Sequence, residues 1–259
     1  MELLIFFVCL AASAAGGICG IGGGVIIKPV LDALGVLSVS AISFLSGLTV
    51  LSMSVISVFR QRKARLVELG TGSLLAAGAV AGGIAGNAAF QAVKAMAGSD
   101  RFTGVVQALV LALVTLLTLV YSAFLRDRLP SFRVQNPLAC VGLGGSMGLL
   151  SAFLGIGGGP VNLAVLYFAF SMDTKKAAAN SLYIIMFSQF SSFLTSCVQG
   201  TIPVFPWHYL LLMTAAGVLG GILGSRVYKR ISAEATDKLF AGLLCGIVLI
   251  CLYNAWRFA

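Results

Sequence analysis

Two short glycine strings are the part of this chain whose residue types and spacing could do chemistry. The letters GIGGG occupy residues 20–24 and again residues 155–159, each time inside a long apolar run. A half-helix that begins after such a string presents unpaired backbone N–H groups and the positive end of its dipole. Both features favour a bound anion. We therefore predict an anion site formed by the backbones of Gly22, Gly23, Gly24, Gly157, Gly158 and Gly159.

Polar side chains follow both strings. Asn162 lies in the first helical turn after the second string, where its amide can donate a hydrogen bond. Lys28 lies one turn beyond the first string, and helical side chains lean toward the N-terminus, so its ammonium can lean over the glycines. A lysine in an apolar run is a functional candidate. The alternative is that Lys28 extends outward to the membrane surface beside Asp32.

Four more polar residues could line a cavity in the membrane: Ser43, Asn180, Ser181 and Gln189. Hydroxyls in membrane helices often bond to their own backbone, so the two amides are the stronger candidates.

The composition decides which elements must position these residues. Of the 259 residues, 59% are apolar and 10% are charged, whereas a soluble domain averages about 25% charged residues. About 20 apolar residues are needed for a helix to cross a bilayer. Six apolar runs have about that length, at 36–59, 69–93, 103–125, 177–198, 206–227 and 239–256. Two runs are longer, at 3–31 and 137–170, and the glycine strings interrupt them.

The chain repeats itself in order. After the glycine strings, the pattern of residues 78–86 resembles that of residues 216–224. This order indicates duplication, so we predict a first membrane repeat over 1–125, a basic cytoplasmic linker over 126–136 and a second repeat over 137–259.

The basic residues predict that the repeats are inverted. If the run at 137–170 enters and returns as a hairpin, thirteen basic residues fall on one side, and those in 91–102 together with Arg257 fall on the other, with Lys28 not counted. Eight single spans would divide them evenly, and the positive-inside rule favours the uneven division. We therefore expect an all-α polytopic membrane protein in which each repeat is a glycine-broken hairpin plus three transmembrane helices. Eight plain spans with a weak charge bias are the alternative.

Other glycines have a simpler interpretation. Small residues let membrane helices approach closely, and this is all that we infer for Gly82, Gly83, Gly86 and the matching Gly220, Gly221 and Gly224. The same could hold for the GIGGG strings. We favour a functional role there, because broken helices inside a membrane require protein or a wet cavity around their backbones.

Several classes of function are disfavoured. The net charge of +9 comes from short clusters between apolar runs, which indicates membrane orientation and not nucleic-acid binding. The six cysteines form no metal-binding pattern, so we expect no metal and no cofactor. We expect no enzyme, because HExxH and paired carboxylates in a span are missing. Cation transport and a buried carboxylate relay are also disfavoured, because acidic residues fall at the ends of runs or in loops: Glu68, Asp100, Asp127, Asp173, Glu234 and Asp237.

The chain resembles the TauE/SafE sulfite exporter family, also called the 4-toluene sulfonate uptake permease family. The resemblance rests on GIGGGVIIKPVL at 20–31, GIGGGPVNLAVL at 155–166 and the Ala178–Ser181 segment. It implies a multi-pass transporter of the bacterial inner membrane that handles sulfite, thiosulfate or sulfonates. Ala164 stands where the family has a second proline, and Lys28 where an aliphatic residue is expected. Both departures could change the substrate.

We therefore predict a secondary transporter for a sulfur-containing anion that works by alternating access, with the anion held at the glycine breaks. An anion channel, or a transporter of a carboxylate or another small anion, is the alternative. The expected partners are the lipid bilayer, the small anion and a coupling proton or sodium ion, and the expected assembly is a monomer or a homodimer.

Overall fold

The computed structural model describes residues 1–61, 66–97, 100–126, 128 and 131–258, and these residues form helices and loops without a strand. The helices are α1 (Glu2–Cys19), α2 (Gly24–Leu34), α3 (Val39–Gln61), α4 (Leu69–Ala97), α5 (Asp100–Val120), α6 (Pro137–Leu154), α7 (Gly159–Phe170), α8 (Thr174–Val198), α9 (Trp207–Tyr228) and α10 (Ala233–Phe258). A π-helical turn, η2 (Tyr121–Leu125), continues α5. In this described part, eight helices are long and apolar enough to cross a membrane. The predicted all-α membrane protein is confirmed.

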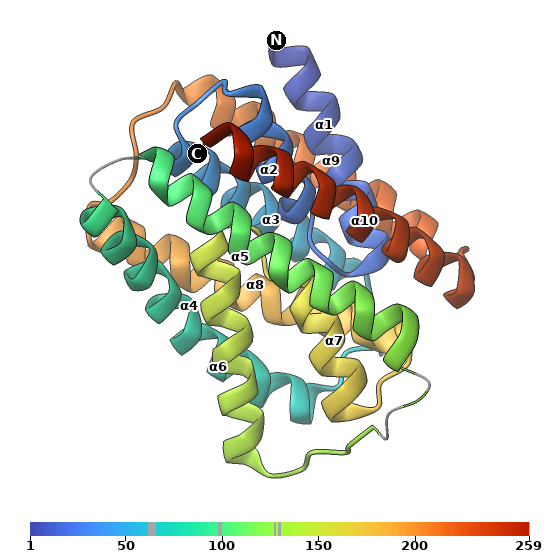
Figure 1. Ribbon diagram of the computed structural model, residues 1–259. Helices are drawn as coiled ribbons and strands as arrows, with labels where there is room; N and C mark the ends of the chain where they lie inside the picture. Colours follow the sequence, from blue (N-terminus) through green and yellow to red (C-terminus); the bar gives the residue numbers. More distant parts are fainter. Residues whose placement is uncertain (62–65, 98–99, 127, 129–130, 259) are drawn as a thin grey trace.

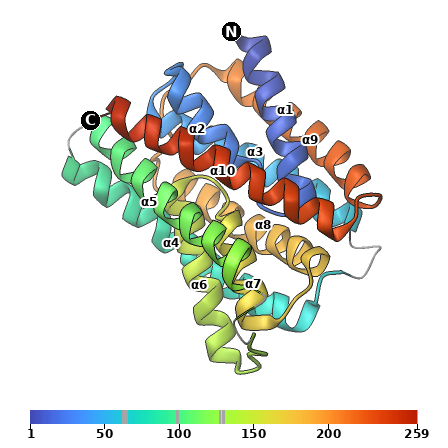
Figure 2. The same ribbon diagram turned by 45° about the vertical axis from the view of Figure 1, so that its right-hand side comes forward.

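The surface carries the large apolar side chains that a bilayer requires. Figures 1 and 2 show α5 and α10 side by side along one flank of the molecule. Both helices expose leucines there, and Leu113 and Leu249 are 58% and 69% exposed. Apolar patches of this extent on a soluble protein would drive association. In lipid they are the expected surface.

Both glycine strings break their helices, as predicted. The first break lies between α1 and α2, where Gly20 adopts the left-handed φ of 79° and its N–H bonds back to the Gly16 carbonyl. The second lies between α6 and α7, where Gly155, Gly157 and Gly158 all have positive φ. Glycine adopts such angles without the steric cost that a Cβ atom would bring.

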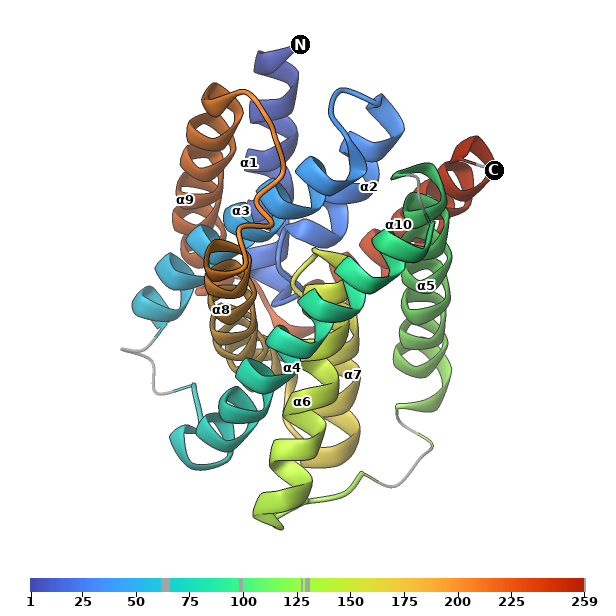
Figure 3. The ribbon, with the colours of Figure 1, turned by 90° about the vertical axis from the view of Figure 1, so that its left-hand side faces the viewer.

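Each break forms the tip of a helical hairpin. Figure 3 shows α1–α2 and α6–α7 entering the molecule from opposite ends, with their tips meeting near the middle. The tips touch backbone to backbone, because a Cβ on Gly24 would lie 2.6 Å from the Ile156 carbonyl oxygen and a Cβ on Gly159 would overlap the Ile21 carbonyl. Opposed hairpins are the arrangement expected of inverted repeats. The repeat itself, with its limits at 1–125, 126–136 and 137–259, stays a prediction.

Each hairpin packs mainly against helices of the other half of the chain. The helix α1 packs on α9, and α6 packs on α4. Glycines make both contacts close: a Cβ on Gly224 would lie 2.5 Å from the Ala14 carbonyl oxygen, and Gly82 and Gly86 lie against carbonyls of α6. The interpretation of these glycines as helix-contact residues is confirmed.

The positive φ at the second break predicts a position-specific cost for a side chain. Gly158 has a φ of 66°, and a Cβ there would lie 2.8 Å from the Cβ of Ser151. Gly158→Ala should therefore lower the free energy of unfolding by at least about 1 kcal/mol, measured by thermal unfolding in detergent. Gly142→Ala is the matched control, because Gly142 lies in α6 with open space around it. It should be neutral, or stabilising by up to about 1 kcal/mol. Equal stability of the two variants would contradict this geometry.

The predicted topology places the loop before α9 outside the cell and the start of α10 inside. Val204, in the loop before α9, is 98% exposed, and Glu234 lies exposed at the start of α10, beside a basic segment. In a variant without native cysteines, Val204→Cys should react with a membrane-impermeant thiol reagent on intact cells. Glu234→Cys should react only after the membrane is opened. Labelling of both from outside would contradict the predicted topology.

Candidate functional site

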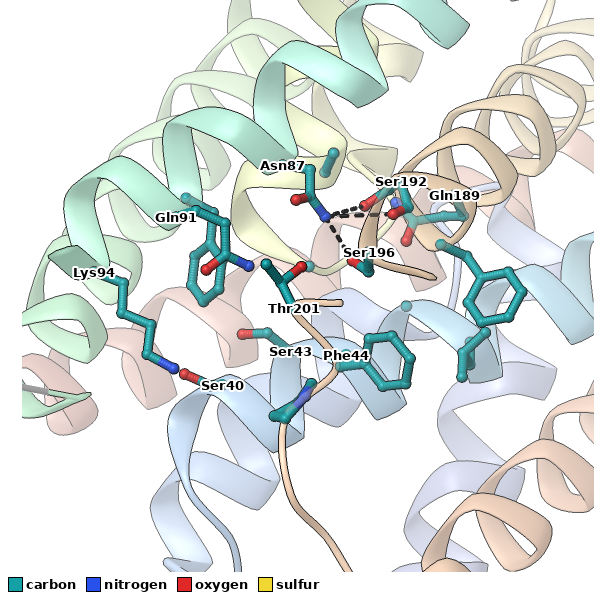
Figure 4. Close-up of a pocket in the computed structure, with 17 residues that line it drawn as sticks. Ser40, Ser43, Phe44, Asn87, Gln91, Lys94, Gln189, Ser192, Ser196 and Thr201 are labelled. Carbon is teal, nitrogen blue, oxygen red and sulfur yellow. Dashed lines mark hydrogen bonds between the residues drawn. The ribbon is translucent and has the colours of Figure 1, made fainter. Parts of the chain in front are cut away.

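A polar cavity lies between α3, α4, α8, the loop after α8 and the end of α6 (Figure 4). Its volume is about 60 Å³, measured as the space that the centre of a water-sized sphere can occupy. One water molecule needs roughly 10–15 Å³ on this measure, so the cavity has room for several waters or one small polyatomic ion. The polar residues that line it are Ser40, Ser43, Asn87, Gln91, Lys94, Gln189, Ser192, Ser196 and Thr201.

One face of α4 supplies the strongest polar groups. Asn87, Gln91 and Lys94 follow one another at helical spacing, so their side chains share that face. Figure 4 shows the Lys94 ammonium extending along the cavity toward Ser40 on α3. Among the described lining residues Lys94 is the only charged one, and none is a carboxylate. A cation surrounded by hydroxyls and amides suits an anion.

Hydrogen bonds fix the wall that α8 contributes. The Asn87 amide donates to the Ser196 hydroxyl at 2.8 Å and to the Ser192 hydroxyl and carbonyl at 3.3 Å. The Gln189 amide donates to the Ser151 hydroxyl on α6 at 2.9 Å. These bonds join α4, α8 and α6 around the cavity, so the wall is held in place before any ligand arrives.

Ser43 and Gln189, both predicted from the sequence, line this cavity. The second glycine string reaches the cavity through Gly155. If Gly155 had a Cβ atom, that atom would lie 2.9 Å from the Ser43 Cβ, so the two residues are in close contact. The cavity therefore ends where the α6 helix breaks.

The six glycines of the predicted anion site lie just beyond the cavity and are packed by protein. The α-carbons of Gly22 and Gly157 both face Val50 on α3 and Ile185 on α8. The N-terminus of α7 contains Asn162, which is fully buried. Neither polar atom of its side chain has a hydrogen-bond partner among the described residues.

Asn180 and Ser181 lie elsewhere, toward the other end of α8. The Asn180 amide donates to the Leu66 carbonyl at 3.1 Å, and its oxygen accepts from the Glu68 N–H at 3.1 Å. The Ser181 hydroxyl donates to the Gly20 carbonyl at 2.6 Å. Asn180 and Ser196 are sixteen residues apart on α8, which is about 24 Å along a helix. The structure therefore does not bring these two residues to the cavity.

The Lys28 side chain lies beside Asp32, as the second interpretation expects, but it is buried and does not extend outward to the membrane surface. Contact between Lys28 and an anion stays a prediction. The Lys28 ammonium lies 2.6 Å from the Asp32 carboxylate, and the two residues are 2% and 6% exposed. Asp32 is thus a buried carboxylate. The sequence pattern, which places acidic residues at ends and in loops, does not predict it.

Sequence reasoning missed Lys94, Asn87 and Gln91. A signal for them was present, because Lys94 belongs to the few basic residues on the side that the positive-inside rule leaves almost uncharged. Arg257, another of these exceptions, donates to backbone carbonyls at the end of α2 and so has a structural role.

Comparison with known proteins agrees with this architecture. The family model described as "Sulfite exporter TauE/SafE" matches residues 5–250. The "Probable membrane transporter protein MamO" of Magnetospirillum gryphiswaldense is 23% identical over 120 residues, which are 44% of this chain and 19% of that protein. No solved structure gives a significant match. The family match covers nearly the whole chain, including both glycine breaks and the cavity between the helices, and the chain therefore belongs to the TauE/SafE sulfite exporter family.

Proposed function

We propose that this membrane transporter carries a sulfur-containing anion such as sulfite, thiosulfate or a small organosulfonate by alternating access. The observation that carries the proposal is the polar cavity that ends at the second glycine break, with Lys94 as its cation and no carboxylate among its described lining residues.

The chemistry of the cavity supports an oxyanion. Sulfite, thiosulfate and sulfonates present several oxygens in different directions, and the cavity offers an ammonium on one side and hydroxyls or amides on the others. Hydrogen bonds between charged and polar partners are roughly twice as strong as neutral ones. Lys94 also lies on the predicted outer side, where few other basic residues compete for an arriving anion.

The glycine strings lie next on the path of the anion. From the cavity the anion passes Ser43 and Gly155 and reaches the N-terminus of α7. There the Asn162 amide, which has no partner among the described residues, can donate to it. The backbones of Gly157, Gly158 and Gly159, together with those of Gly22, Gly23 and Gly24 in the opposed hairpin, then complete the site. This step requires α3 and α8 to move, because Val50 and Ile185 cover the strings in this conformation.

The opposite end of the molecule supports alternating access. There Asn180 and Ser181 join α8 to the loop before α4 and to the first string, and the Tyr228 hydroxyl donates to the Lys175 carbonyl at 2.6 Å. These bonds hold that end closed while the cavity at Gly155 is accessible. We assign Asn180 and Ser181 to this inner gate and not to the binding site.

A second hollow at the inner end of the molecule matches the first cavity, if the predicted repeat holds. This second hollow is lined by Gln61, Leu66, Lys175, Tyr228 and Lys229. When the halves are aligned through Gly82 and Gly220, Tyr228 and Lys229 occupy the positions of Phe90 and Gln91, which line the first cavity. Two equivalent openings, one at each end, are what an inverted-repeat transporter uses in turn.

Transport assays test the proposal directly. Purified protein in liposomes should exchange labelled sulfite, thiosulfate or methanesulfonate for the same anion inside. Acetate and chloride are the control anions. Each carries a single negative charge, as methanesulfonate does, but acetate is a carboxylate and chloride is a halide. Saturable exchange of at least one sulfur anion is the expected result. Movement of acetate alone would assign a carboxylate substrate, non-saturating current would assign a channel, and no movement of any anion would refute transport by this site.

Lys94 should carry much of the affinity for the anion. Lys94→Gln removes a charge-assisted bond worth about 1.5–3 kcal/mol, so the KM for exchange should rise roughly ten- to hundredfold. Lys94→Arg should keep much of the affinity. The matched control is Arg101→Gln, because Arg101 is basic and exposed near the same end of the molecule. An equal effect of the two glutamine variants would mean that Lys94 acts only through surface charge.

A further inference from the structure

The Lys28–Asp32 pair is a buried ion pair that no structural need explains. Both residues lie on the short helix α2, one turn apart, with 2.6 Å between the ammonium and one carboxylate oxygen. Burying an ion pair costs about as much desolvation energy as its attraction returns, so such pairs seldom add stability. Ionisable residues inside membrane proteins are instead associated with substrate and proton pathways.

Only one of the two carboxylate oxygens of Asp32 takes part in this ion pair. Asp32 Oδ2 accepts from Lys28, whereas Oδ1 is buried without a hydrogen-bond partner among the described residues. The Asn254 side chain on α10 is in the same condition, because its amide donates to the Pro29 carbonyl at 2.7 Å while its oxygen has no partner in the described chain. Two acceptors that lack a partner among the described residues therefore lie in one buried place, where a shared proton would satisfy both.

A small cavity joins these acceptors. It is lined by Lys28, Asp32, Asn254, Cys251 and Gln107, among others, and its volume is about 10 Å³. This is roughly the room that one water molecule needs. A proton reaching Asp32 Oδ1 through such a water would give the carboxylic acid a hydrogen to donate, and Asn254 Oδ1 is an available acceptor.

Gln107 connects this cavity to the anion cavity. The Gln107 amide on α5 donates to the Phe153 carbonyl at 2.7 Å, two residues before the break at Gly155. Its oxygen lies 3.5 Å from the Ser43 hydroxyl, and Ser43 lines the anion cavity. A single side chain therefore separates the ion pair from the wall of the proposed substrate site.

The charges around Asp32 favour a proton over a metal cation. Lys28 lies on the same helix, and α10 contributes Arg257, which donates to the Asp32 and Ala33 carbonyls, and the thiol of Cys251. The helix α5 contributes Gln107, Ala108 and Leu111 to the described lining, and all three are neutral. With an ammonium in direct contact, a sodium ion would be repelled, whereas a proton bonds covalently to the free oxygen.

We propose that Asp32 is the site of a coupling proton. The proposal rests on the anion-transport function above. A proton from one side adds to the carboxylate and forms the neutral acid, so the positive charge of Lys28 is no longer balanced. The extra charge attracts the anion to the neighbouring cavity, and after the conformational change both leave on the other side. Because binding free energies are reciprocal, the anion in turn favours protonation of Asp32.

The test compares net and exchange transport in liposomes with thiosulfate and methanesulfonate, which keep their charge near neutral pH. A proton gradient, acidic outside, should drive their accumulation by the wild-type protein without sodium. In Asp32→Asn, a neutral mimic of the acid, gradient-driven accumulation should fall at least tenfold. Exchange of internal for external anion needs no net proton release, so it should remain measurable.

Two more variants guard against a folding defect and a charge artefact. The double variant Lys28→Met with Asp32→Asn removes both charges, so it leaves no unpaired ammonium, and it should also lose gradient-driven accumulation. Glu234→Gln disrupts another acid–lysine pair at four-residue spacing, one that is exposed on α10, and it should behave as the wild type.

The outcomes separate this proposal from the one on which it rests. Failure of wild-type exchange with every anion would refute the transport function itself. Wild-type exchange that a proton gradient does not drive, or that a sodium gradient drives instead, would overturn the proton assignment. Retention of proton-driven accumulation by Asp32→Asn would place the coupling proton elsewhere.

Discussion

The structure depends on the contact between two interrupted helices in an apolar environment. Each GIGGG string releases backbone groups that lipid cannot satisfy. The tips of the two hairpins solve this problem for each other, since Gly24 lies against Ile156 and Gly159 against Ile21 without room for a side chain at either position. The two halves of the chain must therefore meet at this point, and the cavity, the gate and the ion pair all lie within a few turns of it.

The same contact organises the polar groups. Ser43 on α3 lies against Gly155, and Ser181 on α8 donates to the Gly20 carbonyl. Each half of the chain therefore places a serine at the glycine break of the other half. Ser43 lines the cavity, whereas Ser181 is held in a hydrogen bond to the Gly20 carbonyl. The two glycine breaks therefore have different surroundings, and the proposed alternating access requires such a difference between the two ends.

Much of this fold could be predicted from the sequence, because bilayer thickness fixes helix length and glycine fixes the breaks. The eight long and two short helices of the described residues, and the close contacts of Gly82 and Gly224, follow from those two constraints. Ser43 and Gln189 at the cavity were also predictable, since amides and hydroxyls inside apolar runs are costly unless they are used. The assignments that depend on tertiary contacts were less accessible. Asn180 looks like a cavity residue in sequence, yet it bonds to a loop more than a hundred residues away. Lys28 turns toward Asp32, although the intrinsic lean of helical side chains points it the other way.

The packing of α1 on α9 has a consequence for how the protein is made. The helix α1 is synthesised well before α9, and its face of small residues, Ser13, Ala14 and Gly17, fits the glycines of α9. Until then α1 has no proper neighbour on that face, and the hairpin that it forms with α2 carries an ion pair and an interrupted backbone into lipid. During synthesis this face of α1 therefore stays uncovered until α9 has been made.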